Sequence, residues 1–523
     1  MPPIPLFAAE SVDLLRILLF LATVFASLCP ASPSHAEQAD INAAARGAVR
    51  VVLLEDSGDE VELVGYGSGL AVARNLVLTN AHVIQPAQGR EDIRIGVVPP
   101  QGQRGTFTRV LAVSPRNDLA LLQIEEGSLP PITLFTGGIA DGSQVFAVGY
   151  PGSVDFAQGL DPWEIISPMT PVKTQGTVSA GRSAKGFETI LHTAPIGSGN
   201  SGGPLLDACG RAIGVNSFGA VAGEADSEFF FAVSIREVMR FLSAAEVKPM
   251  TTGAPCRSIA DLDREQASRD AAERERDRLA DQQRAEALRK AEREAQMDIL
   301  SERENTMALA GLALILAVVC GAAAFVFAQK EDRGRDTWIA ALLGIGIAIF
   351  AVVTWLSKPR MEEATERAKD AVAEAQQRTR PAQNPDTPLV GSLVCVLDTA
   401  SSRITVSSTT DVPFSWTSTG CVNDRTQYGL GADGWSRILV PNEEQTVTVA
   451  SYDPDTATYR TDRYLLDLET MDRLRTKRGE YEAPACDVGD GAARELGSIQ
   501  DGLRTLLPQQ PNERLVYRCA RKR

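Results

Sequence analysis

One serine in this chain is set in a glycine-rich loop that leads directly into an apolar run. The stretch "TAPIGSGNSGGPLLD" extends from Thr193 to Asp207, and Ser201 lies within its "GNSGG" core. Such a loop is either an ordinary tight turn or a bent backbone that presents one hydroxyl and nearby N–H groups to a substrate. A serine hydroxyl becomes an effective nucleophile only when a base takes its proton, a carboxylate orients that base and N–H donors stabilise the oxyanion.

The choice of base is narrow because the chain has 3 histidines. His35 falls in the N-terminal export segment described below, and His192 falls in a β-like run shortly before Ser201. His82 lies in "VLTNAHVI", at the end of an apolar run, where a strand would hold its side chain at the edge of a cleft. The carboxylate candidate is Asp118 in "RNDLALLQI", directly before an apolar run. Taken alone, His82 would fit a structural role and Asp118 a strand-capping role, but together with Ser201 they predict a catalytic triad.

The three segments resemble the signature segments of trypsin-like serine proteases, which have the chymotrypsin fold. They read "LTNAHV", "NDLALLQI" and "GSGNSGGPL" in the order His, Asp, Ser, and their wording is most similar to that of bacterial HtrA-like (Deg-type) proteases. The resemblance covers residues 43–242 and implies two successive β-barrels with a cleft between them. It further implies that His82 is the general base and then the acid, Asp118 its orienting carboxylate and Ser201 the nucleophile.

The resemblance also implies an oxyanion hole formed by the backbone N–H groups of Gly199 and Ser201. Glycine fits at position 199 because its N–H must turn inward, in a conformation that a side chain would oppose. The residues expected by position to line the primary pocket are Pro195, Ile196, Asn216, Ser217 and Phe218. None of them is a carboxylate, so we expect a small or apolar residue before the cleaved bond rather than Lys or Arg. We assign His192 a structural role, with a substrate subsite as the alternative.

The glycine-broken pattern predicts the fold class of the first half of the chain. From residue 38 to residue 247, short β-like runs such as "AVRVVLL", "IRIGVV" and "QVFAVGY" follow one another between turn signals. This pattern is typical of a sandwich or closed barrels rather than of alternating β/α units. We therefore predict an all-β double-barrel trypsin-like protease domain over residues 37–250. HtrA-like proteases usually carry one or two PDZ domains after this domain, and none is recognisable here.

The N-terminus predicts a signal peptide over residues 1–36. Arg16 precedes the apolar run "ILLFLATVFASL", and "SHA" at Ser34–Ala36 offers small residues around a cleavage site. The run is short for a stable membrane span, which favours a signal over an anchor. The acidic Glu10 and Asp13 before the run depart from the usual pattern, and whether the segment is cleaved stays open.

Beyond the protease domain the chain changes character. Between residues 257 and 305 there are 14 acidic and 11 basic residues in 49 positions, without Gly or Pro. Large apolar residues are sparse there, so a solvated single helix that acts as a stalk is favoured over an oligomerising coiled coil. We expect residues 361–384 to form a second charged helix and a linker.

Two uncharged apolar segments, residues 307–328 and 337–356, predict a transmembrane hairpin. A buried helix of a soluble protein is the alternative for each, but two in tandem with a short polar connection favour the hairpin. The Lys and Arg counts on the two sides do not decide the orientation. The export signal does, and it predicts a bacterial inner-membrane protein whose protease and C-terminal domains face the periplasm.

Residues 387–523 predict a C-terminal extracytoplasmic α+β domain of unknown fold, with strand-like runs early and helical patterns late. No catalytic constellation is recognisable in it. The even number of cysteines in this exported region predicts two disulfides with three open pairings among Cys395, Cys421, Cys486 and Cys519. Cys209 and Cys256 form either another disulfide or two buried thiols.

Charge and composition narrow the function. The net charge of −15 argues against a nucleic acid as the main partner. With few histidines and no finger-like cysteine spacing, no metal or cofactor is expected. We predict a membrane-tethered extracytoplasmic serine endopeptidase that cleaves proteins or peptides in envelope quality control or regulated proteolysis. The alternative is a catalytically inactive protease-fold scaffold coupled to an extracytoplasmic binding or sensor domain. A homo-oligomer is allowed but not indicated.

Overall fold

The computed structural model describes residues 35–521, except 59–60, 103, 185, 220–228, 330–333, 358–362, 380–389, 408–409 and 487–488. The described chain divides into two compact units, the first from residues 1–264 and 388–523 and the second from residues 265–387. The predicted signal peptide, residues 1–36, lies outside the described residues except for its last two, which begin helix α2 (His35–Ala45).

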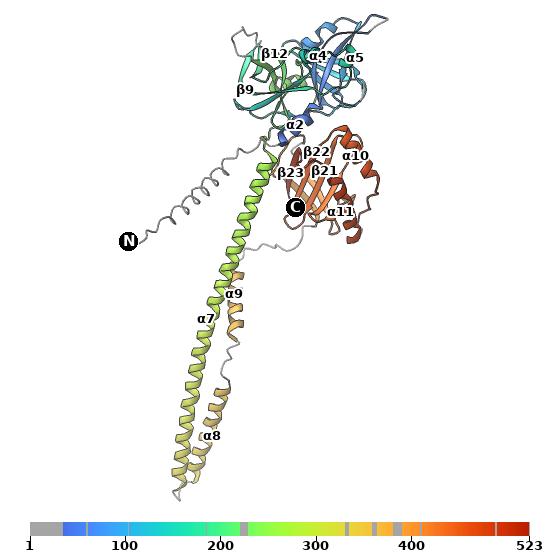
Figure 1. Cartoon of the computed structure of the whole chain (residues 1–523). Coiled ribbons are helices and arrows are strands. Elements are labelled where there is room, and N and C mark those ends of the chain that lie inside the picture. Colours follow the sequence, from blue (N-terminus) through green and yellow to red (C-terminus); the bar gives the residue numbers. More distant parts are fainter. Residues whose placement is uncertain are drawn as a thin grey trace, which may run out of the picture. The chain divides into compact units, whose positions relative to one another are not determined.

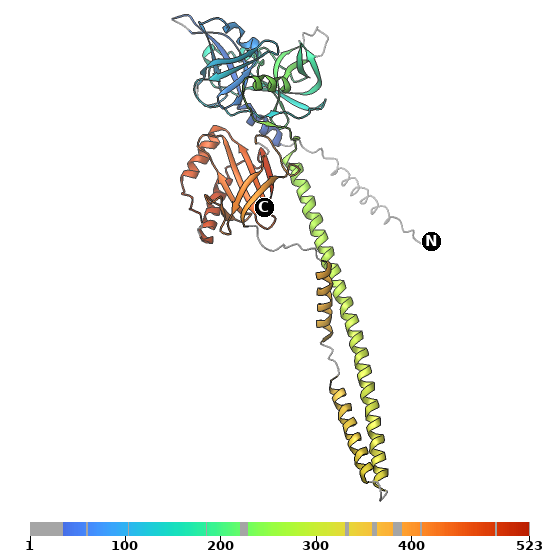
Figure 2. The same cartoon turned by 180° about the vertical axis from the view of Figure 1, so that it is seen from behind.

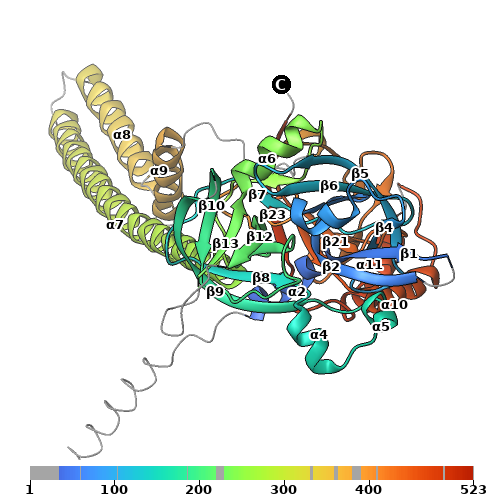
Figure 3. The same ribbon diagram turned by 90° about the horizontal axis from the view of Figure 1, so that it is seen from above.

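The first unit opens with a closed six-stranded antiparallel barrel (Figure 3). Its strand order is β1-β2-β3-β6-β5-β4, and a core of Val, Leu, Ile and Ala side chains fills its interior. Residues Ala81–Ile84 (α3) and Gln85–Ala87 (η1) follow the third strand. The strands are β1 (Ala48–Asp56), β2 (Val61–Ala73), β3 (Leu76–Thr79), β4 (Ile93–Val98), β5 (Thr106–Ser114) and β6 (Leu119–Ile124).

A second six-stranded ring follows in the order β11-β8-β9-β10-β13-β12, and the β11–β12 pairing closes it. This confirms the predicted double-barrel architecture. Short helices α4 (Gly152–Gln158) and α5 (Pro162–Ile165) lie between β8 and β9. The ring strands are β8 (Gln144–Gly149), β9 (Val172–Ala184), β10 (Phe187–His192), β11 (Pro204–Asp207), β12 (Ala212–Gly219) and β13 (Phe230–Ser234), and β7 (Leu134–Phe135) and β14 (Thr251–Thr252) extend the sheet.

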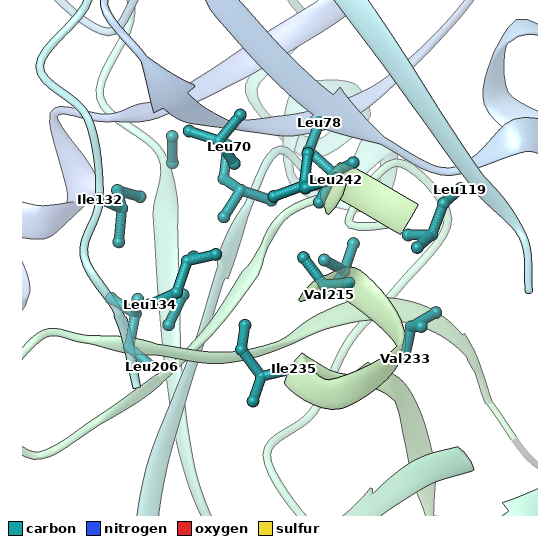
Figure 4. Close-up of a cluster of buried hydrophobic side chains, with 14 of the residues drawn as sticks. Leu70, Leu78, Leu119, Ile132, Leu134, Leu206, Val215, Val233, Ile235 and Leu242 are labelled. Atoms are coloured by element: carbon teal, nitrogen blue, oxygen red, sulfur yellow. The ribbon is translucent and has the colours of Figure 1, made fainter. Parts of the chain in front are cut away.

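One hydrophobic cluster joins the two barrels (Figure 4). Leu70 and Leu78 come from the first barrel, whereas Leu206 and Val215 come from the second. Helix α6 (Ile235–Ala244) closes the cluster. Its residues 235, 238, 241 and 242 are buried, which is the spacing of one helix face, and the Ser234 side chain caps its first turn. Because both barrels share this cluster, their relative placement is part of the core packing.

The C-terminal segment of the first unit forms a nine-stranded antiparallel sheet with two helices (Figure 1). The sheet order is β18-β17-β16-β15-β23-β22-β21-β20-β19, and one of its two hydrophobic clusters is rich in aromatic side chains. The strands are β15 (Gly391–Leu397), β16 (Val412–Trp416), β17 (Cys421–Val422), β18 (Thr426–Gln427), β19 (Gly429–Gly431), β20 (Gly434–Leu439), β21 (Thr446–Asp453), β22 (Thr458–Leu465) and β23 (Glu513–Arg521), and the helices are α10 (Leu468–Gly479) and α11 (Asp490–Arg504).

Three disulfides select among the cysteine pairings that the sequence leaves open. The bond Cys395–Cys519 links β15 to β23, where the two cysteines are also partners in the strand register. The other two bonds are Cys421–Cys486 and Cys209–Cys256. The alternative of buried thiols at positions 209 and 256 is therefore wrong in this structure.

A buried ion pair within the first unit joins Asp40 of α2 to Arg403. The side chains are 3% and 1% exposed, and Asn512 Nδ2 also donates to Asp40 Oδ1 at 2.7 Å. Removing the partner of a buried carboxylate that is paired and hydrogen-bonded in this way destabilises the fold, because the remaining charge would be buried without compensation.

The second unit consists of helices that run alongside one another (Figure 1, Figure 2). Helix α7 (Ile259–Ala328) is one continuous helix of 70 residues that passes through both the charged range 257–305 and the apolar range 307–328. Helices α8 (Gly334–Leu356) and α9 (Glu363–Thr379) run alongside it. Arg367 of α9 pairs with Glu302 at 3.5 Å, and a side chain at Gly344 would meet the Ala317 carbonyl oxygen at 3.3 Å.

Candidate active site

His82 and Asp118, which the sequence analysis pairs, lie in direct contact. His82 sits in α3, three residues beyond the end of β3, and Asp118 directly precedes β6. The His82 Nδ1 atom lies 2.9 Å from Asp118 Oδ2 and 3.1 Å from Oδ1. The His82 backbone N–H donates to Asp118 Oδ1 at 3.1 Å. Antiparallel pairing of β3 with β6 brings the two segments together.

The backbone of Asp118 is held in a conformation that few non-glycine residues adopt. Its φ is +54°, in the left-handed region. Asn80 Nδ2 donates to the Asp118 carbonyl oxygen at 2.8 Å and helps to hold this conformation. Burial alone would raise the pKa of the Asp118 carboxyl, but hydrogen bonds from His82 and Ser217 lower the pKa below its ordinary value. The carboxylate is therefore ionised at neutral pH.

Ser217 connects this pair to the candidate nucleophile. Its hydroxyl donates to Asp118 Oδ2 at 2.6 Å, while its carbonyl oxygen accepts a hydrogen bond from Ser201 Oγ at 2.9 Å. The sequence predicts Ser217 only as a residue of the substrate pocket, and its contact with Asp118 was not predicted. No local pattern marks it, because the contact with Asp118 bridges 99 positions of the chain. Ser201 must rotate its hydroxyl away from Ser217 to donate to His82.

The loop around Ser201 requires its glycines. Gly199 has a φ of +98°, and a side chain there would place a Cβ 2.3 Å from the Tyr150 carbonyl oxygen. Gly202 has a φ of +90°, and its Cβ would lie 2.1 Å from the Ser68 carbonyl oxygen. Within the part of the chain that the structure describes, the N–H groups of Gly199 and Ser201 have no hydrogen-bond acceptor. Two free donors are thus available beside the serine hydroxyl.

The five residues predicted to line the pocket have different surroundings. Asn216 is fully buried, and its Nδ2 donates to the Pro204 carbonyl oxygen at 3.0 Å, so this side chain faces the barrel interior. Phe218 stacks on Phe231 with the ring centroids 4.8 Å apart. Pro195 is exposed and Ile196 is half-buried against the core of the second barrel. Ser217, as described above, contacts Asp118.

His192 lies in the protein interior. Its side chain is fully buried, with its ring 6.0 Å from that of Phe230. Neither ring nitrogen has a hydrogen-bond partner among the described residues. Burial lowers the pKa of His192 from 6.5 to about 4. This environment supports the structural role expected for it.

Among the described residues, no group of three or more His, Cys, Asp or Glu side chains is placed to hold a metal ion.

Comparison with known proteins shows which family the segment containing these contacts resembles. The family described as "Trypsin-like peptidase domain" matches residues 67–215, a range that contains His82, Asp118 and Ser201. The chain carries a trypsin-like peptidase domain. This peptidase domain is HtrA-like: the chain is 32% identical over 200 residues to "Protease Do-like 5, chloroplastic" of Arabidopsis thaliana, and the match covers 36% of this chain and 59% of that protein.

Two further relatives show the same similarity. "Serine protease HTRA2, mitochondrial" of Bos taurus is 34% identical over 199 residues, which is 37% of this chain and 38% of that protein. "Probable periplasmic serine endoprotease DegP-like" of Chlamydia muridarum (strain MoPn / Nigg) is 33% identical over 162 residues, 29% of this chain and 28% of that protein. The match therefore spans less than two thirds of each of these relatives.

The burial of His192 predicts a pH-dependent stability. Between pH 6.5 and about 4 the unfolded chain binds a proton at this residue that the folded chain does not bind, so the free energy of unfolding falls as the pH falls. The loss reaches about 3 kcal/mol at pH 4. His192→Gln is expected to flatten this slope, measured as the urea midpoint at pH 4.5, 5.5 and 7. An unchanged slope would show that His192 does not titrate in this way.

Proposed function

We propose that the chain is a membrane-tethered extracytoplasmic serine endopeptidase that hydrolyses peptide bonds of protein substrates with His82, Asp118 and Ser201. One observation carries the proposal. The imidazole of His82 lies against both oxygens of a lowered-pKa carboxylate, which Ser217 connects to the Ser201 hydroxyl. The family similarity of the surrounding domain supports the same assignment.

The reaction follows from these contacts. The Asp118 carboxylate accepts the Nδ1–H of His82, so that the lone pair is on Nε2. The Ser201 hydroxyl turns from the Ser217 carbonyl toward this nitrogen, loses its proton to it and attacks the substrate carbonyl carbon. The N–H groups of Gly199 and Ser201 donate to the oxyanion. The imidazolium then protonates the leaving amine, and a water molecule activated by His82 releases the acyl group from Ser201.

The inactive scaffold is the second candidate, and a specific observation favours it. In this structure the Ser201 hydroxyl is committed to the Ser217 carbonyl oxygen rather than to His82. A chain that kept this arrangement with substrate bound would bind proteins without cleaving them. The two candidates therefore differ in whether Ser201 becomes nucleophilic.

Labelling with a fluorophosphonate probe separates the two candidates. The full-length protein in detergent is expected to be labelled once per chain, with labelling lost in Ser201→Ala and His82→Ala. Asp118→Asn is expected to slow labelling and peptide cleavage by about 10⁴-fold, because the imidazole loses the tautomer that it needs. Ser128→Ala, an exposed serine outside the site, is the matched control and should be labelled normally. If the wild-type protein folds but is not labelled, or cleaves no peptide, the result supports the inactive-scaffold candidate.

The tether and the location are also part of the proposal. Helices α7 and α8 each contain a segment long and apolar enough to cross a membrane, and 22% and 11% of the residues in those apolar windows are buried. Such low burial favours membrane spans over core helices of a soluble protein. The three disulfides of the first unit are typical of an oxidising compartment. One relative is itself named a probable periplasmic protease. We infer a bacterial inner-membrane protein with its protease and C-terminal domains in the periplasm, acting in envelope quality control or regulated proteolysis.

Alkaline-phosphatase fusions test this topology. Fusions at Ala254 and Gln383 are expected to be active, because phosphatase requires the oxidising periplasm, whereas a fusion at Gly334 is expected to be inactive. A fluorescent-protein fusion that folds only in the cytoplasm should give the reverse pattern. Fluorescence at positions 254 and 383 would place both domains in the cytoplasm and refute the proposed location.

Substrate preference can be tested independently. Since Pro195, Ile196 and Phe218 present apolar surface and none of the predicted pocket residues is acidic, cleavage is expected after small or apolar residues. Profiling a peptide library with the full-length protein measures this preference. Strict cleavage after Arg or Lys would contradict it and would indicate a carboxylate in the pocket that this assignment misses.

A further inference from the structure

A buried ion pair links the first barrel to helix α4, the segment that contacts the loop carrying Ser201. Arg50 lies in β1, and Asp155 lies in α4 between two strands of the second barrel. Their side chains are 1% and 7% exposed, and Arg50 Nη2 lies 2.9 Å from Asp155 Oδ1. Two charges withdrawn from water in this way are stable only when both remain in place.

Arg50 also holds the second helix of the same segment. Its Nη1 donates to the Ile165 carbonyl oxygen of α5 at 2.5 Å. The rings of Tyr66 and Tyr150 lie near the guanidinium, with centroids 5.3 Å and 4.6 Å from its central carbon. One arginine of the first barrel therefore fixes both α4 and α5.

The start of α4 controls the peptide group that precedes Gly199. The N–H of Gly152, its first residue, donates to the Ser198 carbonyl oxygen at 2.8 Å. The carbonyl and N–H of a trans peptide point in opposite directions. When the Ser198 carbonyl points at Gly152, the N–H of Gly199 must point to the other side of the loop, away from α4.

Contacts from the first barrel hold the remainder of the loop. The Ser68 hydroxyl donates to the Gly199 carbonyl oxygen at 2.7 Å, and the Ser68 N–H donates to the Ser201 carbonyl oxygen at 2.8 Å. Ser68 is also the partner of Arg50 in the β1–β2 register. The orientation of the Ser198–Gly199 peptide, by contrast, depends on the contact with Gly152.

We propose that Arg50 and Asp155 are positioning residues that hold α4 so that Gly152 keeps the Gly199 N–H turned toward the oxyanion. This inference deepens the proposed function and rests on it. If the pair is broken, a buried charge is left without a partner and α4 shifts to relieve it. The Ser198–Gly199 peptide can then rotate, and the oxyanion loses one donor while the pocket is unchanged.

Asp155→Asn in the full-length protein tests the inference. We expect kcat for a fluorogenic peptide to fall about 10- to 100-fold with KM within about 3-fold, because an oxyanion donor acts on the transition state. The inhibition constant of a peptide boronic acid, which forms the tetrahedral adduct on Ser201, should rise by the same factor as kcat/KM falls. Binding of the uncleaved substrate peptide to an Asp155→Asn, Ser201→Ala double variant should match that of Ser201→Ala alone.

Asp207→Asn is the matched control because it breaks a similar pair elsewhere in the second barrel. Arg211 and Asp207 are 1% and 15% exposed, with Nη2 and Oδ2 2.5 Å apart. This variant should lower the thermal midpoint as Asp155→Asn does, but keep kcat within about 2-fold. If Asp155→Asn fails to fold, Arg50→Lys keeps the charge but loses the two-point geometry, and kcat should fall about 3- to 10-fold.

The outcomes separate this inference from the function on which it rests. Suppose that the wild type is active and that the folded Asp155→Asn and Arg50→Lys variants keep a normal kcat and normal boronic-acid binding. This result overturns the positioning role and leaves the protease assignment intact. Equal losses of kcat in Asp155→Asn and Asp207→Asn also overturn it, because they would reflect stability alone. A folded wild type without cleavage or probe labelling refutes the proposed function, and the inference with it.

Discussion

The ionised carboxylate of Asp118 is the group on which the candidate site depends. It accepts hydrogen bonds from the His82 ring, the His82 backbone and the Ser217 hydroxyl. These donors outweigh the cost of partial burial, and they orient the imidazole and the strand that contacts Ser201. The left-handed backbone of Asp118 is the strain that accompanies this arrangement.

The site also requires that two separately closed barrels keep one relative position. Their shared hydrophobic cluster supplies the bulk of that constraint, since close-packed interiors resist small displacements. Polar contacts additionally fix the orientation of specific segments of one barrel relative to the other. Ser68 of the first barrel bonds the loop of the second barrel that carries Ser201, and Arg50 bonds the helices before β9. The loop that carries Ser201 on one barrel is thus held in a fixed position relative to His82 and Asp118 on the other.

Different interactions stabilise the other parts of the chain. In the nine-stranded sheet, an aromatic core and two disulfides supply the stability. In the second unit, the helices α7 and α8 expose apolar side chains that a soluble fold would bury. A trypsin-like peptidase domain, a cross-linked sheet and two helices with exposed apolar segments thus occur in one chain.

The sequence by itself determined the local features: the Ser201 loop with its glycines, the apolar segments 307–328 and 337–356, the charged helix before them and the run of short strands. Each of these features can be predicted from the sequence because its residues are neighbours in the chain, and backbone sterics or solvation act on them directly. Only the tertiary structure decided the role of Ser217, the Arg50–Asp155 pair and the disulfide pairing. These contacts join residues that are between 47 and 124 positions apart in the chain. Strand register and barrel closure bring such residues together, and no local pattern records that step.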